Sequence, residues 1–357
     1  MTPHVTKPAF AASSGPRDAK IALVGEAWGE HEAREGRPFV GASGQELTRL
    51  LTEAGIDREA CFLTNVIAGR PAPTSNNFDQ LCGSKLEVGK GYPLGPIKPG
   101  KYLRPEYLDE LLRLTHELKV VKPNIVVALG GTATWALIGT GAISRVRGTV
   151  TPGKLTSVKV LPTFHPAYLF QVWKDRPIVL LDLMKARRES AYPEFRRPER
   201  KVHVSPTLGT VAGWIDFAMH PSTIAVAVDI ETTNGQIESI GFATSKDNAL
   251  VVPFVTRSPL RSYWPTHEEE VQARRLCNRL LSSRVPKIGQ NFLFDLQFLL
   301  REGFTPRACM HDTMLLHHAM YPELQKGLAF LGSCYTNEPA WKLMRKRKKE
   351  EQLKRDD

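Results

Sequence analysis

The chain has 357 residues, five cysteines and a formal net charge of +11, and 42% of its residues are hydrophobic. This length predicts two domains, and the hydrophobic content excludes a wholly disordered chain. The cysteines are odd in number and form no CxxC pair, which argues against a disulfide framework or a cysteine zinc site. Because neither a signal peptide nor a membrane-spanning run is evident, we expect a cytoplasmic protein without membrane association. The positive charge favours a polyanionic partner.

The first part of the chain alternates short apolar runs with amphipathic helical patterns. Residues 1–18 are rich in Pro, Ser and Ala, and we expect a flexible N-terminus there. From residue 19 to residue 190 the strand-like runs are IALV, CFLTNVI, PNIVVAL and VKVLPTF, each followed by a turn and a helical pattern. This alternation predicts an α/β domain with a doubly wound parallel sheet.

A second domain follows a linker rich in proline and charge. The segment SAYPEFRRPERK places this linker at residues 191–200. The alternation then restarts, with three successive strand-like runs, TIAVAVDIETT, IESIGFAT and ALVVPFV, before further helices. We therefore predict a second α/β domain over residues 201–345 and a charged tail at residues 346–357.

Candidate functional groups follow each of the predicted parallel strands of the first domain. They are Glu26, Asn65, the turn at Gly130 and Gly131, and His165. Taken singly, each has an ordinary structural explanation, such as a helix entry, a turn or a satisfied loop histidine. Because ligands bind beyond the carboxyl ends of parallel strands, their shared edge predicts a binding site.

These groups lie in four motifs, GEAWGEHEAREGRPFVGASGQEL, TNVIAGRPAP, NIVVALGGTATWALIG and FHPAYL, which occur in this order. Over residues 19–190 the motifs resemble the uracil-DNA glycosylase superfamily, and especially its family-four-like branch. The resemblance implies a pocket that accepts a base flipped out of DNA. It also implies hydrolysis of the N-glycosidic bond of uracil or a modified pyrimidine.

The resemblance assigns roles to four residues of the pocket. Glu26 would orient water or stabilise the cationic sugar, and His165 would donate a hydrogen bond to a carbonyl oxygen of the departing base. Phe39 would stack on the flipped base, although plain core packing is the alternative for this ring. The amide of Asn65 can donate and accept, so it would read the edge of a pyrimidine.

Further residues are expected to contact DNA. Tyr168 and Leu169 follow the His-Pro pair and would form the wedge that fills the vacated base stack, with core packing as an equal alternative. Gly130 and Gly131 would lie against the DNA at the same edge of the sheet.

One feature of the family-four branch is not matched by this sequence. Its enzymes commonly carry an iron–sulfur cluster held by cysteines near the N-terminus and soon after the Asn motif. This chain has no cysteine before Cys61, and Ala68 and Gly69 stand at the later position. Because such a cluster takes about four thiolates, we predict none. Trp28 also replaces the usual proline of the first motif, which leaves the identity of the base open.

The second domain contains acidic residues spaced for a metal site. The run AVAVDIETT places Asp229 and Glu231 two positions apart on a strand, so both carboxylates project from one face. The run QNFLFD places Asn291 and Asp295 four positions apart at a helix start, again on one face. Since neighbouring like charges are costly unless a cation pairs them, the pattern predicts a divalent metal site.

The strand DxE followed by NxxFD resembles the DnaQ-like 3′→5′ exonucleases, in the form of the proofreading domains of family A DNA polymerases. The resemblance implies a ribonuclease H-like mixed sheet. It also makes Asp229, Glu231 and Asp295 the ligands of two Mg²⁺ or Mn²⁺ ions that activate a water. The family's third motif, a Tyr or His with an Asp one turn later, is not found after Tyr335. Three explanations stay open: a longer natural chain, a partner that supplies the motif, or an inactive nuclease.

Together the two resemblances cover nearly the whole chain. The arrangement resembles the N-terminal part of some bacteriophage DNA polymerases. We therefore expect DNA and a polymerase domain or subunit as partners, and a phage-infected bacterial cytoplasm as the location. The leading hypothesis is a DNA-processing protein with a glycosylase site and a nuclease site. The alternatives are a non-catalytic DNA-binding module, or activity at only one site.

Overall fold

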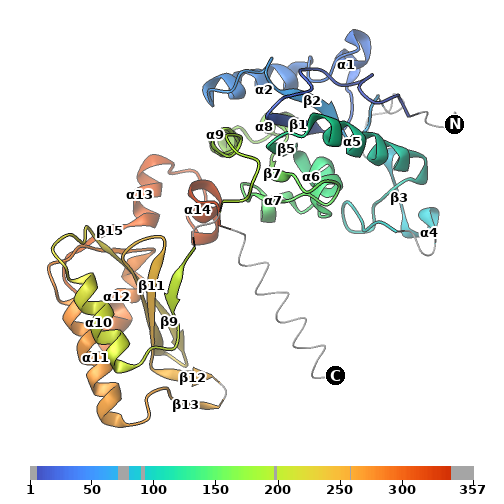
Figure 1. Ribbon diagram of the computed structural model, residues 1–357. Coiled ribbons are helices and arrows are strands. Elements are labelled where there is room, and N and C mark those ends of the chain that lie inside the picture. Colours follow the sequence, from blue (N-terminus) through green and yellow to red (C-terminus); the bar gives the residue numbers. More distant parts are fainter. Residues whose placement is uncertain (1–5, 71–79, 90–92, 197–198, 258, 339–357) are drawn as a thin grey trace. The chain divides into compact units, whose positions relative to one another are not determined.

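The computed structural model in Figure 1 describes residues 6–70, 80–89, 93–196, 199–257 and 259–338. Its contacts divide the chain into two compact units. The first unit runs to Phe195 and takes in the chain again from Ala329, and the second is Arg196–Leu328. The expected tail at 346–357 lies outside the described residues. None of the described helices is long and apolar enough to cross a membrane.

The first unit is built on a five-stranded sheet with the order β2-β1-β5-β7-β6. Strands β1 (Ile21–Gly25), β2 (Phe62–Asn65), β5 (Ile125–Leu129) and β7 (Lys159–Thr163) are parallel, and the short β6 (Thr151–Pro152) is antiparallel to β7. Every residue of the four parallel strands is buried. Burial on both faces is typical of a parallel sheet covered by helices, and the predicted parallel sheet is confirmed.

Helices cover both faces of this sheet. One core forms between the sheet and helices α5 (Leu108–Val121) and α6 (Gly130–Ile138). The other core forms with α2 (Ala42–Glu53) and α9 (Arg176–Glu189). Because successive residues of a strand face opposite sides, each strand contributes to both cores. The domain is doubly wound, as predicted.

Short elements complete the first unit. They are α1 (Glu30–Glu35), α4 (Lys85–Val88), η1 (Pro105–Tyr107), α7 (Ile143–Val146), α8 (Pro166–Leu169), η2 (Trp173–Asp175) and the ribbon of β3 (Cys82–Gly83) and β4 (Tyr102–Leu103).

The N-terminus, which was expected to be flexible, is packed where the structure describes it. Ser14 exchanges backbone hydrogen bonds of 2.9 and 2.8 Å with Leu63 of the edge strand β2. The Phe10 N–H donates to Glu117 Oε1 at 2.9 Å, and Ala12 is buried. An edge strand leaves backbone groups unpaired, and Ser14 satisfies two of them, which explains the difference.

The second unit contains a six-stranded mixed sheet with the order β15-β14-β9-β10-β11-β8. Strands β9, β10 and β11 form an antiparallel meander, whereas β14 runs parallel to β9 and β15 parallel to β14. The strands are β8 (Lys201–His203), β9 (Val226–Thr233), β10 (Gln236–Ala243), β11 (Asn248–Pro253), β14 (Lys287–Gly289) and β15 (Cys309–Asp312). The mixed sheet that the exonuclease resemblance implied is confirmed.

In the described residues of the second unit, the remaining elements are a ribbon and four helices. They are β12 (Val255–Arg257), β13 (Leu260–Ser262), α10 (Leu208–Ala218), α11 (His267–Leu281), α12 (Phe292–Arg301) and α13 (Thr313–Met320).

The last described helix, α14 (Leu328–Tyr335), belongs to the first unit from its second residue, Ala329, onward. Lys185 Nζ of α9 donates to the carbonyls of Gly148, Ser333 and Thr336, at 2.7 Å for the first and the last. The prediction kept this segment with residues 201–345. The structure instead assigns this segment to the first unit. The reason is that the buried Lys185 needs several acceptors, and the backbone after Leu328 supplies two of them.

A second buried cation joins the same segment to the first unit. Arg147 pairs with Asp182 at 2.9 Å and donates to Cys334 Sγ at 3.5 Å. Its guanidinium also lies 5.1 Å from the centroid of the Phe330 ring. The late segment is therefore an integral part of the packing around α9.

Candidate active sites

The carboxyl ends of the parallel strands bring together the groups predicted for the first domain. Glu26 follows β1, Asn65 ends β2, Gly130 follows β5, and His165 comes two residues after β7. The parallel register sets Gly25 opposite Asn65. These residues, far apart in sequence, therefore share one edge of the sheet.

Gly25 is the point where two of the predicted base-binding groups converge. A Cβ at this position would lie 2.7 Å from Cζ of Phe39 and still closer to Oδ1 of Asn65. Both side chains are buried, and the Phe39 ring centroid is 6.4 Å from that of His165. Only glycine leaves room for an amide and an aromatic ring side by side, as a base pocket requires.

Phe39 is held in an unusual backbone conformation by charged neighbours. Its φ is +55°, in the left-handed region that non-glycine residues rarely adopt. Glu32 Oε1 accepts from the N–H groups of Val40 and Gly41 at 3.0 and 2.8 Å, and Arg58 donates to the carbonyl of Phe39 at 2.9 Å. Glu32 and Arg58 thus brace the loop from both sides. Neither residue was predicted from the sequence.

His165 is arranged as a neutral donor. Its Nδ1 accepts from the N–H of Ala167 at 3.1 Å, which places the proton of the neutral ring on Nε2. Burial lowers the pKa of His165 to about 4, and the charge of Glu32 opposes this shift only in part. The ring is therefore uncharged at neutral pH and can donate one hydrogen bond through Nε2.

The predicted glycines Gly130 and Gly131 lie at the start of α6, next to Thr132, which contacts Glu26. The hydroxyl of Thr132 donates to Glu26 Oε2 and fixes that carboxylate. Gly130 has φ +87°, and a Cβ there would lie 3.1 Å from the Cβ of His165. A Cβ at Gly131 would meet the carbonyl of Gly141 at 3.3 Å. Both glycines thus have packing reasons, and their contact with DNA stays a prediction.

Asn65 is supported from behind by a buried ionic network that sequence reasoning missed. Arg113 pairs with Glu110 at 2.7 Å and with Glu117 at 2.8 Å, and it donates to the backbone carbonyl of Asn65 at 2.6 Å. The hydroxyl of Thr64 donates to Glu117 at 2.8 Å. The spacing of the three charged residues along one face of α5, among its apolar residues, is the signal that could have revealed them.

Of the predicted wedge of Tyr168 and Leu169, the second residue takes the position expected from the alternative of core packing. Leu169 is 0% exposed and belongs to the core beneath α2 and α9. Tyr168 donates through its hydroxyl to Asp175 at 2.8 Å, and its ring centroid lies 4.9 Å from that of Phe164. Residues 166–169 form one helical turn, α8, and the phase of that turn directs Leu169 inward. The structure therefore favours core packing for Leu169, and a role of Tyr168 or Leu169 at DNA stays a prediction.

The residues of the first unit do not fit an iron–sulfur cluster. This unit contains three cysteines, Cys61, Cys82 and Cys334, each a buried free thiol, whereas a cluster takes about four thiolates. Trp28 is buried against Ala12 and Ala68, in the loops where the resemblance places the cluster cysteines. Apolar packing therefore takes the place of thiolate ligands.

In the second unit, Asp229 and Glu231 lie on the exposed face of β9, while the residues between and before them face the core. Their partners across β10 are Gly241 and Ser239, both small. Asp295 of α12 is 4% exposed, and its Oδ1 accepts from the N–H of Ile230 at 3.0 Å. The structure thus brings the DxE strand and the helix carboxylate to one place.

These carboxylates disturb one another's ionisation. Burial raises the pKa of Asp295 to about 6, and the charges of Asp229 and Asp312 add to the shift. Burial, followed by the charge of Glu231, also raises the pKa of Asp229. Hard carboxylate oxygens suit Mg²⁺ or Mn²⁺. In the described part of the chain, no three such side chains are gathered closely enough to hold an ion as they stand.

Asp312 has a separate, structural position. Its carboxylate accepts from the backbone N–H groups of Asn291, Phe292 and Met314 at 3.0, 2.8 and 2.8 Å. It therefore caps α13 and fixes the start of α12, which carries Asp295.

Comparison with known proteins identifies both parts of the chain. The uracil DNA glycosylase superfamily matches residues 12–194, and the 3′-5′ exonuclease family matches residues 215–356. The type-4 uracil-DNA glycosylase of Thermotoga maritima is 33% identical over 192 residues, covering 52% of this chain and 84% of that protein. That of Archaeoglobus fulgidus is 34% identical, covering 46% and 73%. That of Sulfurisphaera tokodaii is 33% identical, covering 49% and 72%.

Both family resemblances drawn from the motifs are confirmed by these matches. The first match covers half of the chain, and the relatives match over most of their own length. The chain therefore belongs to the uracil-DNA glycosylase superfamily, as a DNA glycosylase domain followed by a domain of the 3′-5′ exonuclease family.

Proposed function

We propose that the first unit excises uracil from DNA by hydrolysis of the N-glycosidic bond. The observation that carries this proposal is the convergence of the Asn65 amide and the Phe39 ring at Gly25, beside the neutral His165. An amide that can both donate and accept matches the pyrimidine edge of uracil, and an aromatic ring matches its face. The relatives named above are uracil-DNA glycosylases, which supports the same base.

The reaction places positive charge on the sugar and negative charge on the departing base. His165 Nε2–H donates to a carbonyl oxygen of the base as this charge develops, and it does so without giving up its proton. Glu26, fixed by Thr132, faces the cationic sugar and orients the attacking water. The base leaves as an anion that carries the electron pair of the C–N bond and is stabilised by His165 and Asn65. The water oxygen forms the new bond to the sugar carbon, and the proton that this water loses passes to Glu26 and from there to solvent.

For the second unit we propose metal-dependent 3′→5′ cleavage of DNA. Asp229, Glu231 and Asp295 would hold Mg²⁺ or Mn²⁺, which supplies an activated water and stabilises the leaving 3′ oxygen. The small residues Ser239 and Gly241 opposite the carboxylates leave space above β9 for a strand end. The raised pKa values of Asp229 and Asp295 support a site that gains from a bound cation.

The excision proposal is tested with uracil-containing oligonucleotides, single- and double-stranded, treated with alkali after incubation. Wild-type protein is expected to give strand breaks at uracil. Asn65→Ala is expected to reduce the rate by about 10²–10³-fold, as for the loss of one donor to a developing charge. Mg²⁺-dependent shortening of a uracil-free strand by the same variant serves as the control for folding. If the wild type forms no abasic products on uracil or other modified pyrimidines, the proposal is wrong.

The alternative function is a non-catalytic DNA-binding module, which Trp28 in the first motif favours. Salt-sensitive DNA binding without turnover at either site would support it. The pairing of a glycosylase domain with a 3′-5′ exonuclease domain also supports our proposal of a role in bacteriophage DNA replication, beside a polymerase domain or subunit. Co-purification with a polymerase from infected cells tests that role.

A further inference from the structure

The turn that follows His165 presents two large aromatic side chains to solvent. Phe170 is 57% exposed and Trp173 is 58% exposed. Single exposed apolar residues are ordinary. Here, however, two aromatic rings lie three positions apart in the segment that leads away from the base pocket. Leu169, between His165 and Phe170, is fully buried.

This turn is anchored from within. The hydroxyl of Tyr168 is bonded to Asp175, and the Tyr168 ring packs beside Phe164. Backbone hydrogen bonds run from Gln171 and Val172 back to the carbonyl of Tyr168, at 3.0 and 3.1 Å. The contacts of Tyr168 thus stabilise the turn, whereas the rings of Phe170 and Trp173 are exposed to solvent.

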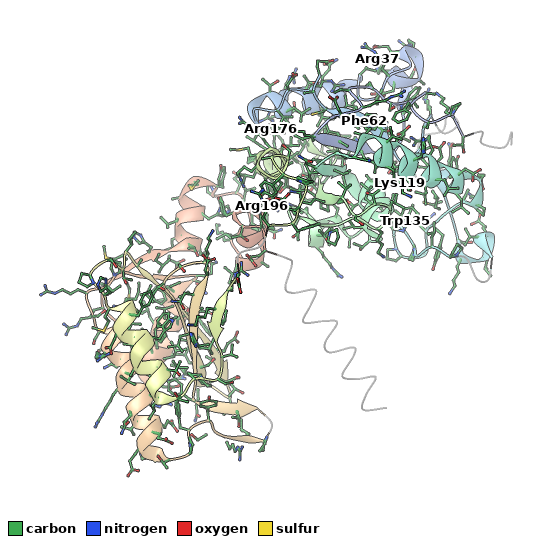
Figure 2. The ribbon with its side chains drawn as sticks, in the orientation of Figure 1. Arg37, Phe62, Lys119, Trp135, Arg176 and Arg196 are labelled. Atoms are coloured by element: carbon green, nitrogen blue, oxygen red, sulfur yellow. The ribbon has the colours of Figure 1, made fainter. Side chains whose placement is uncertain are left out.

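The support beneath Trp173 is also fixed. Arg176, labelled in Figure 2, has its guanidinium 5.3 Å from the Trp173 ring centroid. That guanidinium donates to Glu46 at 2.7 Å and to Glu53 at 2.9 Å, both on α2. Two carboxylates neutralise the arginine, so its part here is to hold the indole in place rather than to bind phosphate.

We propose that Phe170 and Trp173 form the surface on which bases of a DNA strand stack beside the flipped nucleotide, in place of the predicted Leu169. Every base has an aromatic face, so such a surface accepts any sequence around the target. The turn continues directly from His165, and the chain's net charge of +11 suits a nucleic-acid strand. The inference rests on the proposed excision function, which places DNA at His165.

The test measures DNA binding by fluorescence anisotropy on the full chain. The probe is a labelled single-stranded oligonucleotide with an abasic analogue and no uracil, in EDTA so that the second unit holds no divalent ion. Phe170→Ala and Trp173→Ala are each expected to weaken binding about 5- to 100-fold, the effect of losing one stacked base. Phe170→Tyr and Trp173→Phe keep a ring and are expected to bind within a few-fold of wild type.

Phe217→Ala is the matched control, because Phe217 is 55% exposed on α10 of the second unit. It is expected to bind as wild type does, and all variants are expected to keep the thermal midpoint. If either alanine variant at Phe170 or Trp173 binds like wild type, the proposal is overturned. It is also overturned if these variants change the sedimentation coefficient instead, which would mark a protein interface. Weakened binding by both variants, with no uracil excision by wild type, would overturn the proposed function and leave the stacking surface standing.

Discussion

The two candidate sites handle charge in opposite ways. Around the first site, buried charges meet protein groups of opposite character: Glu32 accepts from backbone N–H groups, and Arg113 pairs with Glu110 and Glu117. In the second unit, carboxylates stand near other carboxylates, and the pKa values of Asp229 and Asp295 are raised. At the first site, protein groups alone therefore balance these buried charges, without a bound ion.

This difference matches the chemistry that each site would perform. A uracil base is neutral and planar until the bond breaks, so its pocket needs fixed dipoles and a fixed ring. A phosphodiester carries its charge from the start, and acidic residues can approach it only through cations. The pattern of pKa shifts therefore separates a preorganised pocket from a site that becomes complete on metal binding.

The largest expected effect is at the second site. Asp229→Ala is expected to reduce Mg²⁺-dependent shortening of a 3′ end by on the order of 10³-fold or more, because a metal-activated water is lost. Uracil excision should not change. Asp216→Ala is the matched control, since it removes an exposed carboxylate on α10 that pairs with Arg279 at the surface. If the strand is still shortened by Asp229→Ala, or by wild type in EDTA, the second site does not depend on a bound metal ion and does not differ from the first site in this respect.

The next effect concerns the buried cations of the first unit. Lys185→Met leaves the carbonyls of Gly148, Ser333 and Thr336 without their donor, which is expected to lower the free energy of unfolding by about 2–3 kcal/mol. Urea unfolding of the first unit measures it. Lys119→Met, at an exposed position of α5 labelled in Figure 2, is expected to change little. Equal effects for the two variants would show that the first unit does not depend on α14.

The sequence was sufficient to predict the sheet and the candidate residues that share its carboxyl edge. Continuous apolar runs identify buried parallel strands, and the residues after them share one edge whatever the loops do. Glu26, Asn65 and His165 were predicted in this way, and the structure places them at that edge; their roles stay predictions. Asp229, Glu231 and Asp295 followed from spacing, because strand and helix periods place them on fixed faces.

Other features depend on geometry that no local pattern encodes. In the run Tyr-Leu-Phe after His165, the phase of one short turn decides that Leu169 is buried and Phe170 exposed. Glu32 binds backbone N–H groups, which every sequence possesses, so its role at Phe39 leaves no signature. The apolar sequence of α14 does not show on which unit the helix packs, whereas in the structure its segment supplies acceptors to Lys185 and Arg147.

A smaller effect tests how far the first pocket is preorganised. Glu32→Gln keeps one oxygen but removes the charge that receives the N–H groups of Val40 and Gly41, so the loop of Phe39 should loosen. We expect kcat/KM for uracil excision to fall about 10-fold, equivalent to about 1.4 kcal/mol. Glu30→Gln, at an exposed position of the same helix, is the control. Equal activity of Glu32→Gln and wild type would mean that Phe39 does not need this brace.

The smallest effect concerns the neutral state of His165. Its folded pKa, about 4, lies below the ordinary value near 6.5, so the unfolded chain binds a proton in this interval and the folded chain does not. The contribution of His165 to stability is therefore full above about pH 6.5 and declines as the pH falls towards 4. Between pH 7 and pH 5 the wild type should lose on the order of 1 kcal/mol more unfolding free energy than His165→Gln, which has no ring to protonate. Urea titrations at the two pH values measure this difference. If wild type and His165→Gln lose equal unfolding free energy between pH 7 and pH 5, the folded pocket accepts a charged imidazole. His165 would then not be the neutral donor by which we distinguish this site from the acidic one.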